Sequence, residues 1–249
     1  MILLEIEVLL SQSIRLTVNS HWGLCLHLSY GYEDGTVYGY YNIPKLFGLQ
    51  DTGSMESSGI LQVRENSDLK LDGSGVLIGF VDTGIDYAGS IFLKQDGTTR
   101  VTAIWDQTIP AGSPIRLPVQ PELPETLENI TRTPEGFLYG SEFTHEQLNA
   151  AVKMADAYEG ISSRDEIGHG TFLASIAAGN ELPDGSFTGA APKADIAMVK
   201  LKPAKNRLRA YYQIKEDAVA YQENDIMAGV LYLVSLAKKR QQPLVICLG

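Results

Sequence analysis

Cysteine and basic residues are scarce in this sequence of 249 residues, and long apolar runs are missing. The two cysteines, Cys25 and Cys247, lie near opposite ends of the chain. Two cysteines are too few for a disulfide framework or a zinc ribbon, so we expect both to be buried apolar residues. They leave the redox compartment open, and the sequence assigns no localisation.

The shortage of basic residues excludes one large class of partners. Lys and Arg number 20 against 30 Asp and Glu, which gives a net charge of −10. Binding to a phosphate backbone requires clusters of Lys and Arg, so we expect no nucleic-acid partner. No stretch of about 18 apolar residues is present, so we expect no membrane partner.

Enough apolar sequence remains for one or two compact domains. Apolar residues make up 44% and charged residues 20% of the chain, which excludes a disordered or collagen-like protein. Residues 1–50 are rich in β-forming side chains and predict a small β-rich unit. The first ten residues contain Glu5 and Glu7 and have no basic start, so we expect part of a domain rather than a signal peptide. Residues 51–74 have the composition of a linker.

Strand and helix patterns alternate from residue 75 onward. The apolar run Val76–Val81 is typical of a strand that is buried on both faces of a parallel sheet. Similar strand patterns, and helical patterns between them, recur along the rest of the chain. The strands are expected at 101–105, 194–201 and 243–248, and the helices at 144–158, 168–179 and 223–240. This alternation predicts an α/β fold with a three-layer, mostly parallel sheet.

One segment interrupts the alternation. Six of the eleven prolines fall between Pro110 and Pro134, which predicts a long surface excursion without regular structure. Thr144 is the expected N-cap of the helix that follows.

Three possible functional motifs are weak. The glycines of Asp72–Gly79 precede a strand, whereas a nucleotide-binding loop follows one. His145-Glu146 resembles the start of a zincin helix, but Asn149 stands where a second histidine is required. His21 and His27 have no identifiable ligand partners. We expect all three histidines to be ordinary ones.

Asp82 and His169 form a more informative pair. Asp82 ends the buried strand 76–81, at the sheet edge where catalytic groups of α/β proteins gather. His169 opens a helix with glycine on both sides, which lets another backbone approach the imidazole closely. This arrangement suits a general base. The simpler reading, an aspartate that caps a turn and a histidine near a helix start, stays open on spacing alone.

The surrounding motifs resemble those of subtilisin-like serine peptidases, the subtilases. Val81-Asp-Thr-Gly-Ile-Asp86 resembles the aspartate motif, and Gly168-His-Gly-Thr171 resembles the histidine motif. Gly189-Ala-Ala-Pro192 and the strand after it are similar to the segment that follows the histidine helix in this family. Residues 43–59 resemble the lead-in of subtilases from clostridia and their relatives. The resemblance covers about residues 70–249.

The resemblance implies an incomplete catalytic domain. Residues 1–50 correspond to the remnant of a propeptide, and residues 51–249 to the N-terminal part of the catalytic domain, with an insertion at about 107–165. Asp82 and His169 correspond to two members of an Asp-His-Ser triad in a serine endopeptidase that cleaves polypeptides. The motif of the nucleophilic serine and the oxyanion asparagine are not in this sequence, so we expect the chain alone to be inactive. The last strand is then expected to be exposed.

Several alternatives remain at this stage. Asp82-Thr-Gly84 is also the signature of aspartic peptidases, but those need two such motifs on an all-β scaffold. A non-catalytic pseudopeptidase or peptide-binding protein is the second alternative, and complementation by a separate chain, such as the missing C-terminal half, is the third. We expect no organic cofactor. Calcium is common in the family, but no calcium loop is recognisable here.

Overall fold

The computed structural model describes residues 56–66, 68, 71–117 and 130–249 in full, and only the backbone of strands within residues 5–30. The chain divides into two units, Met1–Leu49 and Gln50–Gly249, which are described separately. In the first unit, β1 (Glu5–Val8), β2 (Ile14–Asn19) and β3 (Cys25–Tyr30) form an antiparallel sheet in the order β1-β2-β3. The predicted β-rich N-terminal unit is therefore confirmed.

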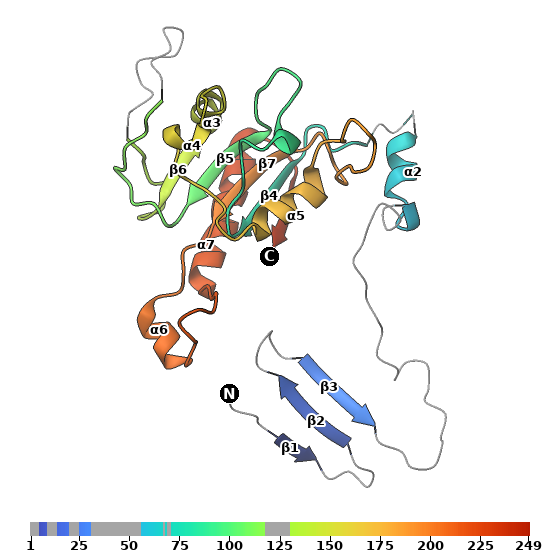
Figure 1. The fold of residues 1–249 in the computed structure, drawn as a ribbon, viewed down its shortest axis with the longest axis vertical. Coiled ribbons are helices and arrows are strands. Elements are labelled where there is room, and N and C mark those ends of the chain that lie inside the picture. Colours follow the sequence, from blue (N-terminus) through green and yellow to red (C-terminus); the bar gives the residue numbers. More distant parts are fainter. Residues whose placement is uncertain are drawn as a thin grey trace. The chain divides into compact units, whose positions relative to one another are not determined.

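The second unit is built on a mixed, mostly parallel sheet of five strands (Figure 1). Its order is β6-β5-β7-β4-β8, and only β6 runs antiparallel to its neighbour. The strands are β4 (Leu77–Asp82), β5 (Val101–Asp106), β6 (Ser141–Thr144), β7 (Asp195–Lys200) and β8 (Leu244–Leu248). Among the described residues β8 pairs only with β4, so it forms an edge of the sheet, opposite β6.

Helices cover both faces of this sheet. The helices of this unit are α2 (Ile60–Glu65), α3 (His145–Val152), α4 (Ala157–Gly160), α5 (His169–Ala178), α6 (Asn206–Tyr211) and α7 (Glu223–Arg240), with a 3-10 turn η2 (Ser90–Phe92). Those that pack on the sheet are α3, α5 and α7. Alternate residues of the central strand β4 face the two sides. Ile78 and Phe80 pack in a cluster with α3 and α5, whereas Leu77 and Val81 pack in a cluster with α7. The predicted three-layer α/β fold is confirmed.

Close packing of α7 depends on a glycine in β4. A Cβ atom at Gly79 would lie 2.7 Å from Cδ1 of Leu233, which is fully buried on α7. A methyl group added there would force the Leu233 side chain to move in a tightly packed interior. Gly79 therefore allows Leu233 to pack closely against β4.

The predicted insertion is anchored on the α7 side of the sheet by aromatic rings. The indole nitrogen of Trp105, at the end of β5, donates to the carbonyl of Tyr139 at 3.2 Å. The Trp105 ring lies 4.5 Å from that of Phe137 and 5.4 Å from that of Tyr232 on α7, measured between centroids. Fully buried aromatic groups contribute much of the hydrophobic stabilisation of a core. Residues 110–117 and 130–134 form no helix or strand, and residues 118–129 lie outside the described part.

Several expected element bounds differ from the structure. The helix expected over 144–158 ends at Val152, and a separate short helix α4 begins after the N-cap Asp156, whose side chain accepts from the Tyr158 amide. Thr144 is the N-cap of α3, with a full capping box to Gln147, as predicted. Strand β6 and helix α6 were not predicted, since four and six residues carry too little periodicity.

Two further expectations differ in detail. Gly179 ends α5, but with φ −62° rather than a left-handed conformation. A Cβ there would lie 2.5 Å from the Ser175 carbonyl oxygen, so close packing and not backbone conformation requires glycine. Cys247 on β8 is an unpaired thiol that is only half-buried, and burial raises its pKa. The side chain of Cys25 lies outside the described residues.

Candidate active site

Asp82 is the last residue of β4 and lies at the carboxyl edge of the sheet. Its side chain is 2% exposed and is on the face covered by α5. The amide of Thr83 donates to Asp82 Oδ1 at 2.6 Å. A buried carboxylate needs such donors, because burial without them strongly disfavours its charge. The β4 strand thus presents a fixed, buried acceptor to the start of α5.

His169 is the first residue of α5, and its imidazole faces that acceptor. Its Nδ1 lies 3.0 Å from both Oδ1 and Oδ2 of Asp82. A carboxylate can only accept, so Nδ1 carries a proton, and in the neutral imidazole Nε2 then carries the free lone pair. The imidazole is half exposed, and no other group in the described residues hydrogen-bonds to Nε2. The structure brings together the two residues predicted from sequence and leaves Nε2 accessible.

Two glycines allow this approach. A Cβ atom on Gly170 would overlap the carbonyl oxygen of Gly84 and would lie 3.1 Å from the Cβ of Asp82. Gly84 itself has φ +129°, a conformation that side chains rarely adopt, and a Cβ there would lie 3.0 Å from the Arg164 carbonyl oxygen. The backbones of the aspartate turn and the histidine helix therefore touch, as expected from the glycines beside His169.

The third glycine of this region begins the helix. Gly168 is the N-cap of α5 with φ +86°, and an added Cβ would meet nothing within 4 Å. Backbone conformation rather than space therefore favours glycine at position 168.

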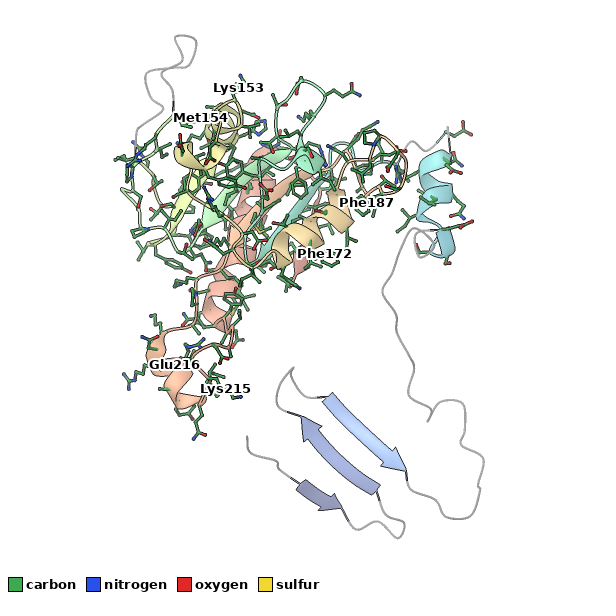
Figure 2. All side chains as sticks on the ribbon, viewed as in Figure 1. Lys153, Met154, Phe172, Phe187, Lys215 and Glu216 are labelled. Atoms are coloured by element: carbon green, nitrogen blue, oxygen red, sulfur yellow. The ribbon has the colours of Figure 1, made fainter. Side chains whose placement is uncertain are left out.

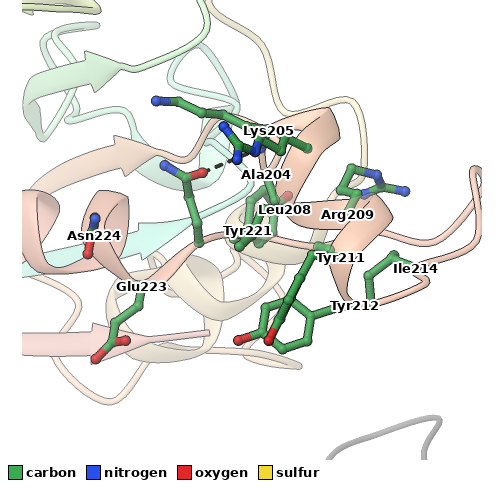
Figure 3. A pocket seen from close by; sticks show the side chains of 13 residues that line it. Ala204, Lys205, Leu208, Arg209, Tyr211, Tyr212, Ile214, Tyr221, Glu223 and Asn224 are labelled. Carbon is green, nitrogen blue, oxygen red and sulfur yellow. Dashed lines mark hydrogen bonds between the residues drawn. The ribbon is translucent and has the colours of Figure 1, made fainter.

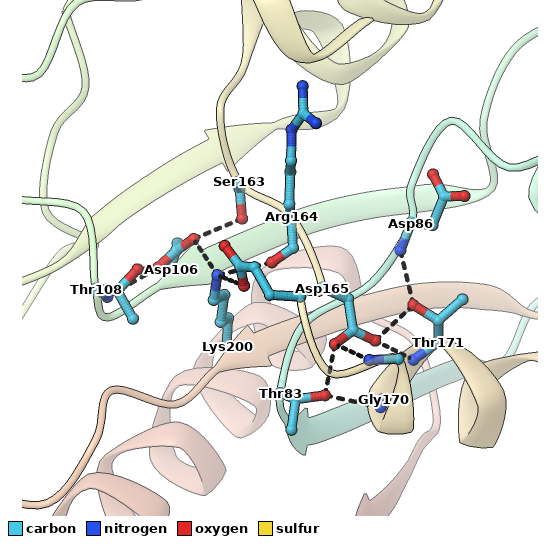
Figure 4. Close-up of polar contacts among 12 residues, drawn as sticks. Thr83, Asp86, Asp106, Thr108, Ser163, Arg164, Asp165, Gly170, Thr171 and Lys200 are labelled. Atoms are coloured by element: carbon cyan, nitrogen blue, oxygen red, sulfur yellow. Dashed lines mark hydrogen bonds and ion pairs between the residues drawn. The ribbon is translucent and has the colours of Figure 1, made fainter. Parts of the chain in front are cut away.

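A network of polar residues surrounds the pair and was not predicted from sequence (Figure 4). Asp165 accepts hydrogen bonds from Thr83 and Thr171, which belong to the aspartate motif and the histidine motif respectively. Burial acts to raise the pKa of the Asp165 carboxyl, but the hydrogen bonds from Thr171, Thr83 and Gly168 outweigh it, and the pKa falls below its ordinary value. The only sequence signal for this role is the position of an aspartate four residues before His169.

Lys200 lies beside this network at the end of β7. It is paired in register with Asp82 on the neighbouring strand. Its buried ammonium donates to the Arg164 carbonyl at 2.7 Å and to Glu166 Oε2 at 2.6 Å, and lies 3.9 Å from Asp106 Oδ2. Asp106, which is fully buried, also accepts from Ser163 at 2.7 Å. The segment before His169 is thus tied to the ends of β5 and β7.

A surface pocket of about 760 Å³ lies beside α6 (Figure 3). Its lining includes Tyr211, Tyr212 and Tyr221. The hydroxyl pKa of Tyr221 is raised by burial and then by the negative charges of Asp82, Asp165 and Glu166.

The weaker sequence candidates have ordinary roles. His145 Nδ1 lies 3.1 Å from the Val101 carbonyl oxygen, and its Nε2 lies 2.9 Å from the Asn149 side-chain amide. Asp72 binds Ser74 and Lys193 at a turn before β4. His21 and His27 lie outside the residues whose side chains are described.

The described residues also carry no obvious metal site. Across the described ranges, no three His, Cys, Asp or Glu side chains gather closely enough to hold a metal ion. No helix in the same ranges is long and apolar enough to cross a membrane.

Three known proteins that are similar to this chain are each described as a protease. Two subtilisin-like proteases of Arabidopsis thaliana are similar: SBT3.5 is 28% identical over 166 residues and SBT3.8 is 31% identical over 144 residues. These matches cover 64% and 51% of this chain, but only 19% and 16% of the plant proteins. The solved structure of the Clostridium perfringens CspB protease aligns with a TM-score of 0.56 and 28% identity, over 79% of this chain and 33% of that one.

The chain therefore spans a fifth or less of the plant relatives and a third of the clostridial structure. The sequence profile of the subtilase family matches residues 73–238, which include both Asp82 and His169. With the mostly parallel sheet and the clostridial neighbour, this match means that the chain belongs to the subtilase family.

Proposed function

We propose that this chain provides the aspartate and histidine of a subtilisin-type serine endopeptidase. The observation that supports this most directly is the contact of His169 Nδ1 with both Asp82 oxygens at 3.0 Å. In the proposed mechanism, His169 Nε2 removes the proton from a serine hydroxyl as its oxygen attacks the peptide carbonyl carbon. His169 then gives that proton to the departing amine. Asp82 holds the imidazole in the required tautomer and stabilises its positive charge.

We also propose that the 249 residues alone do not hydrolyse peptides. After His169 the sequence contains Ser175, Ser186 and Ser235. The hydroxyl of Ser175 donates to the Thr171 carbonyl at 2.8 Å, and that of Ser186 to Asp184 at 2.7 Å. Loss of the serine from a triad of this type lowers the rate about 10⁶-fold, and loss of an oxyanion donor about 10²–10³-fold.

The proposed substrate is an extended polypeptide that adds as a strand near the sheet edge. The pocket beside α6 has room for side chains of such a polypeptide. The acidic balance of the chain supports neither a nucleic acid nor an anionic membrane as partner. A serine-bearing polypeptide segment is the partner that the mechanism requires. We further propose that residues 1–50 are propeptide-like and that about 107–165 is an insertion in the catalytic domain.

The experiment compares the chain alone with the chain supplied with a serine-bearing segment. The segment is encoded by the source DNA after the codon for Gly249 or, if a stop codon follows there, taken from the corresponding part of the C. perfringens CspB protease. Each sample is treated with a fluorophosphonate probe and assayed for casein cleavage. H169A serves as the matched control, because it removes only the proposed base.

The outcomes separate the proposals. We expect labelling of the serine-bearing segment only when it is co-expressed with the wild-type chain, and not with H169A. Labelling of the chain alone would contradict its proposed inactivity. Labelling that H169A does not reduce would contradict the role of His169. A correctly assembled complex that binds peptide without cleaving it would support the alternative of a non-catalytic peptide-binding protein.

A further inference from the structure

Asp165 accepts four hydrogen bonds from the residues that flank the Asp82–His169 pair (Figure 4). Its Oδ1 accepts from Thr83 Oγ1 at 2.7 Å and from the Gly168 amide at 2.8 Å. Its Oδ2 accepts from the amide and the hydroxyl of Thr171 at 2.8 and 2.6 Å. One carboxylate thus joins the turn after β4 to the first turn of α5.

Thr83 extends this connection to both proposed catalytic residues. Its amide donates to Asp82 Oδ1 at 2.6 Å, while its hydroxyl accepts from the amide of Gly170 at 3.0 Å. The hydroxyl has a single proton, which is donated to Asp165, so both of its hydrogen-bonding directions are determined. Hydrogen bonds of Thr83 therefore connect Asp82 to Gly170 on α5, and Asp165 fixes the orientation of the Thr83 hydroxyl.

Thr171 forms a second connection of the same kind. Its hydroxyl donates to Asp165 and accepts from the Asp86 amide at 3.0 Å. Asp86 follows the tight turn at Gly84, so Thr171 joins the far end of the aspartate turn to α5. The two threonines therefore hold both ends of that turn against the helix that carries His169.

Asp165 is itself held from the opposite side. Its neighbours Arg164 and Glu166 bind the buried Lys200 ammonium, through a carbonyl at 2.7 Å and a carboxylate at 2.6 Å. These contacts hold the backbone before Asp165 and the side chain of the residue after it at the end of β7. A half-buried carboxylate that accepts several hydrogen bonds remains ionised and rigid.

We propose that Asp165 is a positioning residue that holds the Asp82 turn and the His169 helix at the separation required for the Asp82–His169 hydrogen bond. Its catalytic meaning rests on the proposed function, but the geometric claim does not. None of its hydrogen bonds within the described residues goes to His169 side-chain atoms, so it acts only through Thr83, Gly168 and Thr171. In this proposal Asp82 and His169 carry out the chemistry, and Asp165 only positions them.

The test follows the Nδ1 proton of His169 by NMR in the 249-residue chain, which requires no catalysis. A hydrogen bond to a carboxylate moves this proton resonance downfield and slows its exchange with solvent. The resonance is assigned by its absence in H169Q. D165N keeps the size of the side chain but replaces one acceptor oxygen with a donor, so two of the four hydrogen bonds are lost.

We expect D165N to lose the downfield resonance while its circular dichroism spectrum stays that of the wild type. D184N is the matched control. Asp184 accepts from the Ser186 amide and hydroxyl in an exposed turn, and its variant removes the same charge and a similar local contact. The resonance should persist in D184N. An unchanged resonance in folded D165N would overturn the proposal, as would its absence from the wild-type chain.

A second pair of variants covers the case in which D165N does not fold. T83V removes the hydroxyl while keeping the shape of the side chain, and T83S restores the hydroxyl. We expect the resonance to be lost in T83V and retained in T83S. Persistence in T83V overturns the proposal, and failure of both D165N and T83V to fold does so too, because Asp165 would then serve the fold in general. If the serine-complemented complex fails to cleave peptide but the resonance depends on Asp165, the proposed function fails and this inference stands.

Discussion

Replacement of Gly170 by alanine tests whether the close approach of two backbones determines the geometry of the site. The new Cβ would overlap the carbonyl oxygen of Gly84, which belongs to the turn after Asp82. Backbone atoms cannot rotate away as side chains do. The start of α5 and this turn must therefore separate by about 1 Å to reach a normal contact distance.

The expected magnitudes differ sharply between stability and geometry. Alanine is favoured over glycine inside a helix by about 1 kcal/mol, while overpacking costs about 1–3 kcal/mol. The net loss in the free energy of unfolding of G170A should therefore stay within about 2 kcal/mol. The hydrogen bond between Asp82 and His169, at 3.0 Å, is far more sensitive, because an increase of about 1 Å in this distance removes it. In a complemented, active complex, a misplacement of this size lowers the rate about 100-fold.

Two measurements on G170A separate these effects. Urea denaturation gives the change in the free energy of unfolding, and the Nδ1 proton resonance reports the contact. The control is G168A on the other side of His169, where φ is +86° but the surrounding space is open. G168A should lose about 1 kcal/mol of stability and keep the resonance. A G170A variant that keeps the resonance would refute the argument that the Gly84–Gly170 contact sets the site.

Three further predictions follow from other contacts. D82N should abolish the downfield His169 resonance and, in the complemented complex, slow fluorophosphonate labelling about 10⁴-fold, because the amide no longer fixes the tautomer. The pKa of Asp165 is lower in the folded state than in the unfolded state. The ionised carboxylate therefore stabilises the fold at pH values above the unfolded-state pKa, and this stabilisation is lost as the pH falls through the folded-state pKa. The difference in unfolding free energy between wild type and D165N should therefore shrink below about pH 4, and a difference that grows there would contradict this sign. Arg100 is buried and donates to the carbonyls of Ile91, Ala178 and Ala194. R100M should therefore lower the free energy of unfolding in urea by at least about 3 kcal/mol, with a lower urea midpoint. A loss below about 1 kcal/mol would contradict the structural role of Arg100.

Strand and helix patterns with strong periodicity predicted the fold well. Helix α7 has the bounds expected from sequence, and β4 is buried along its whole length as its apolar run indicated. On α5, Phe172 and Ile176 have the i, i+4 spacing that is typical of a packed helix face, and they illustrate the limit of such patterns. Both side chains are exposed, and small residues, Ala174 and Ala178, face the sheet instead (Phe172 is labelled in Figure 2). Periodicity located the helix, but it did not identify the face that packs.

The proposed catalytic pair was predictable because its motif is short and local, whereas its supporting network was not. Asp165 lies only four residues from His169, yet its role depends on Thr83, which is distant in sequence and is brought near by the β4–α5 packing. Lys200 reaches the same region from β7. Contacts of this kind arise from the order of strands in the sheet, which a single sequence does not specify.

That strand order also determines when the sheet can form during synthesis. The fully buried strand β4 pairs with β7 and β8, and the nearer of these partners in sequence begins only at Asp195. At translation rates of about 5–20 residues per second, an apolar strand must wait roughly 10 s for its first neighbour. Strand β5 can pair earlier with β6, but its parallel neighbour is the same β7. The emergence of Asp195–Lys200 from the ribosome is therefore the event that allows the centre of the sheet to assemble, because β7 is the strand that lies between β4 and β5.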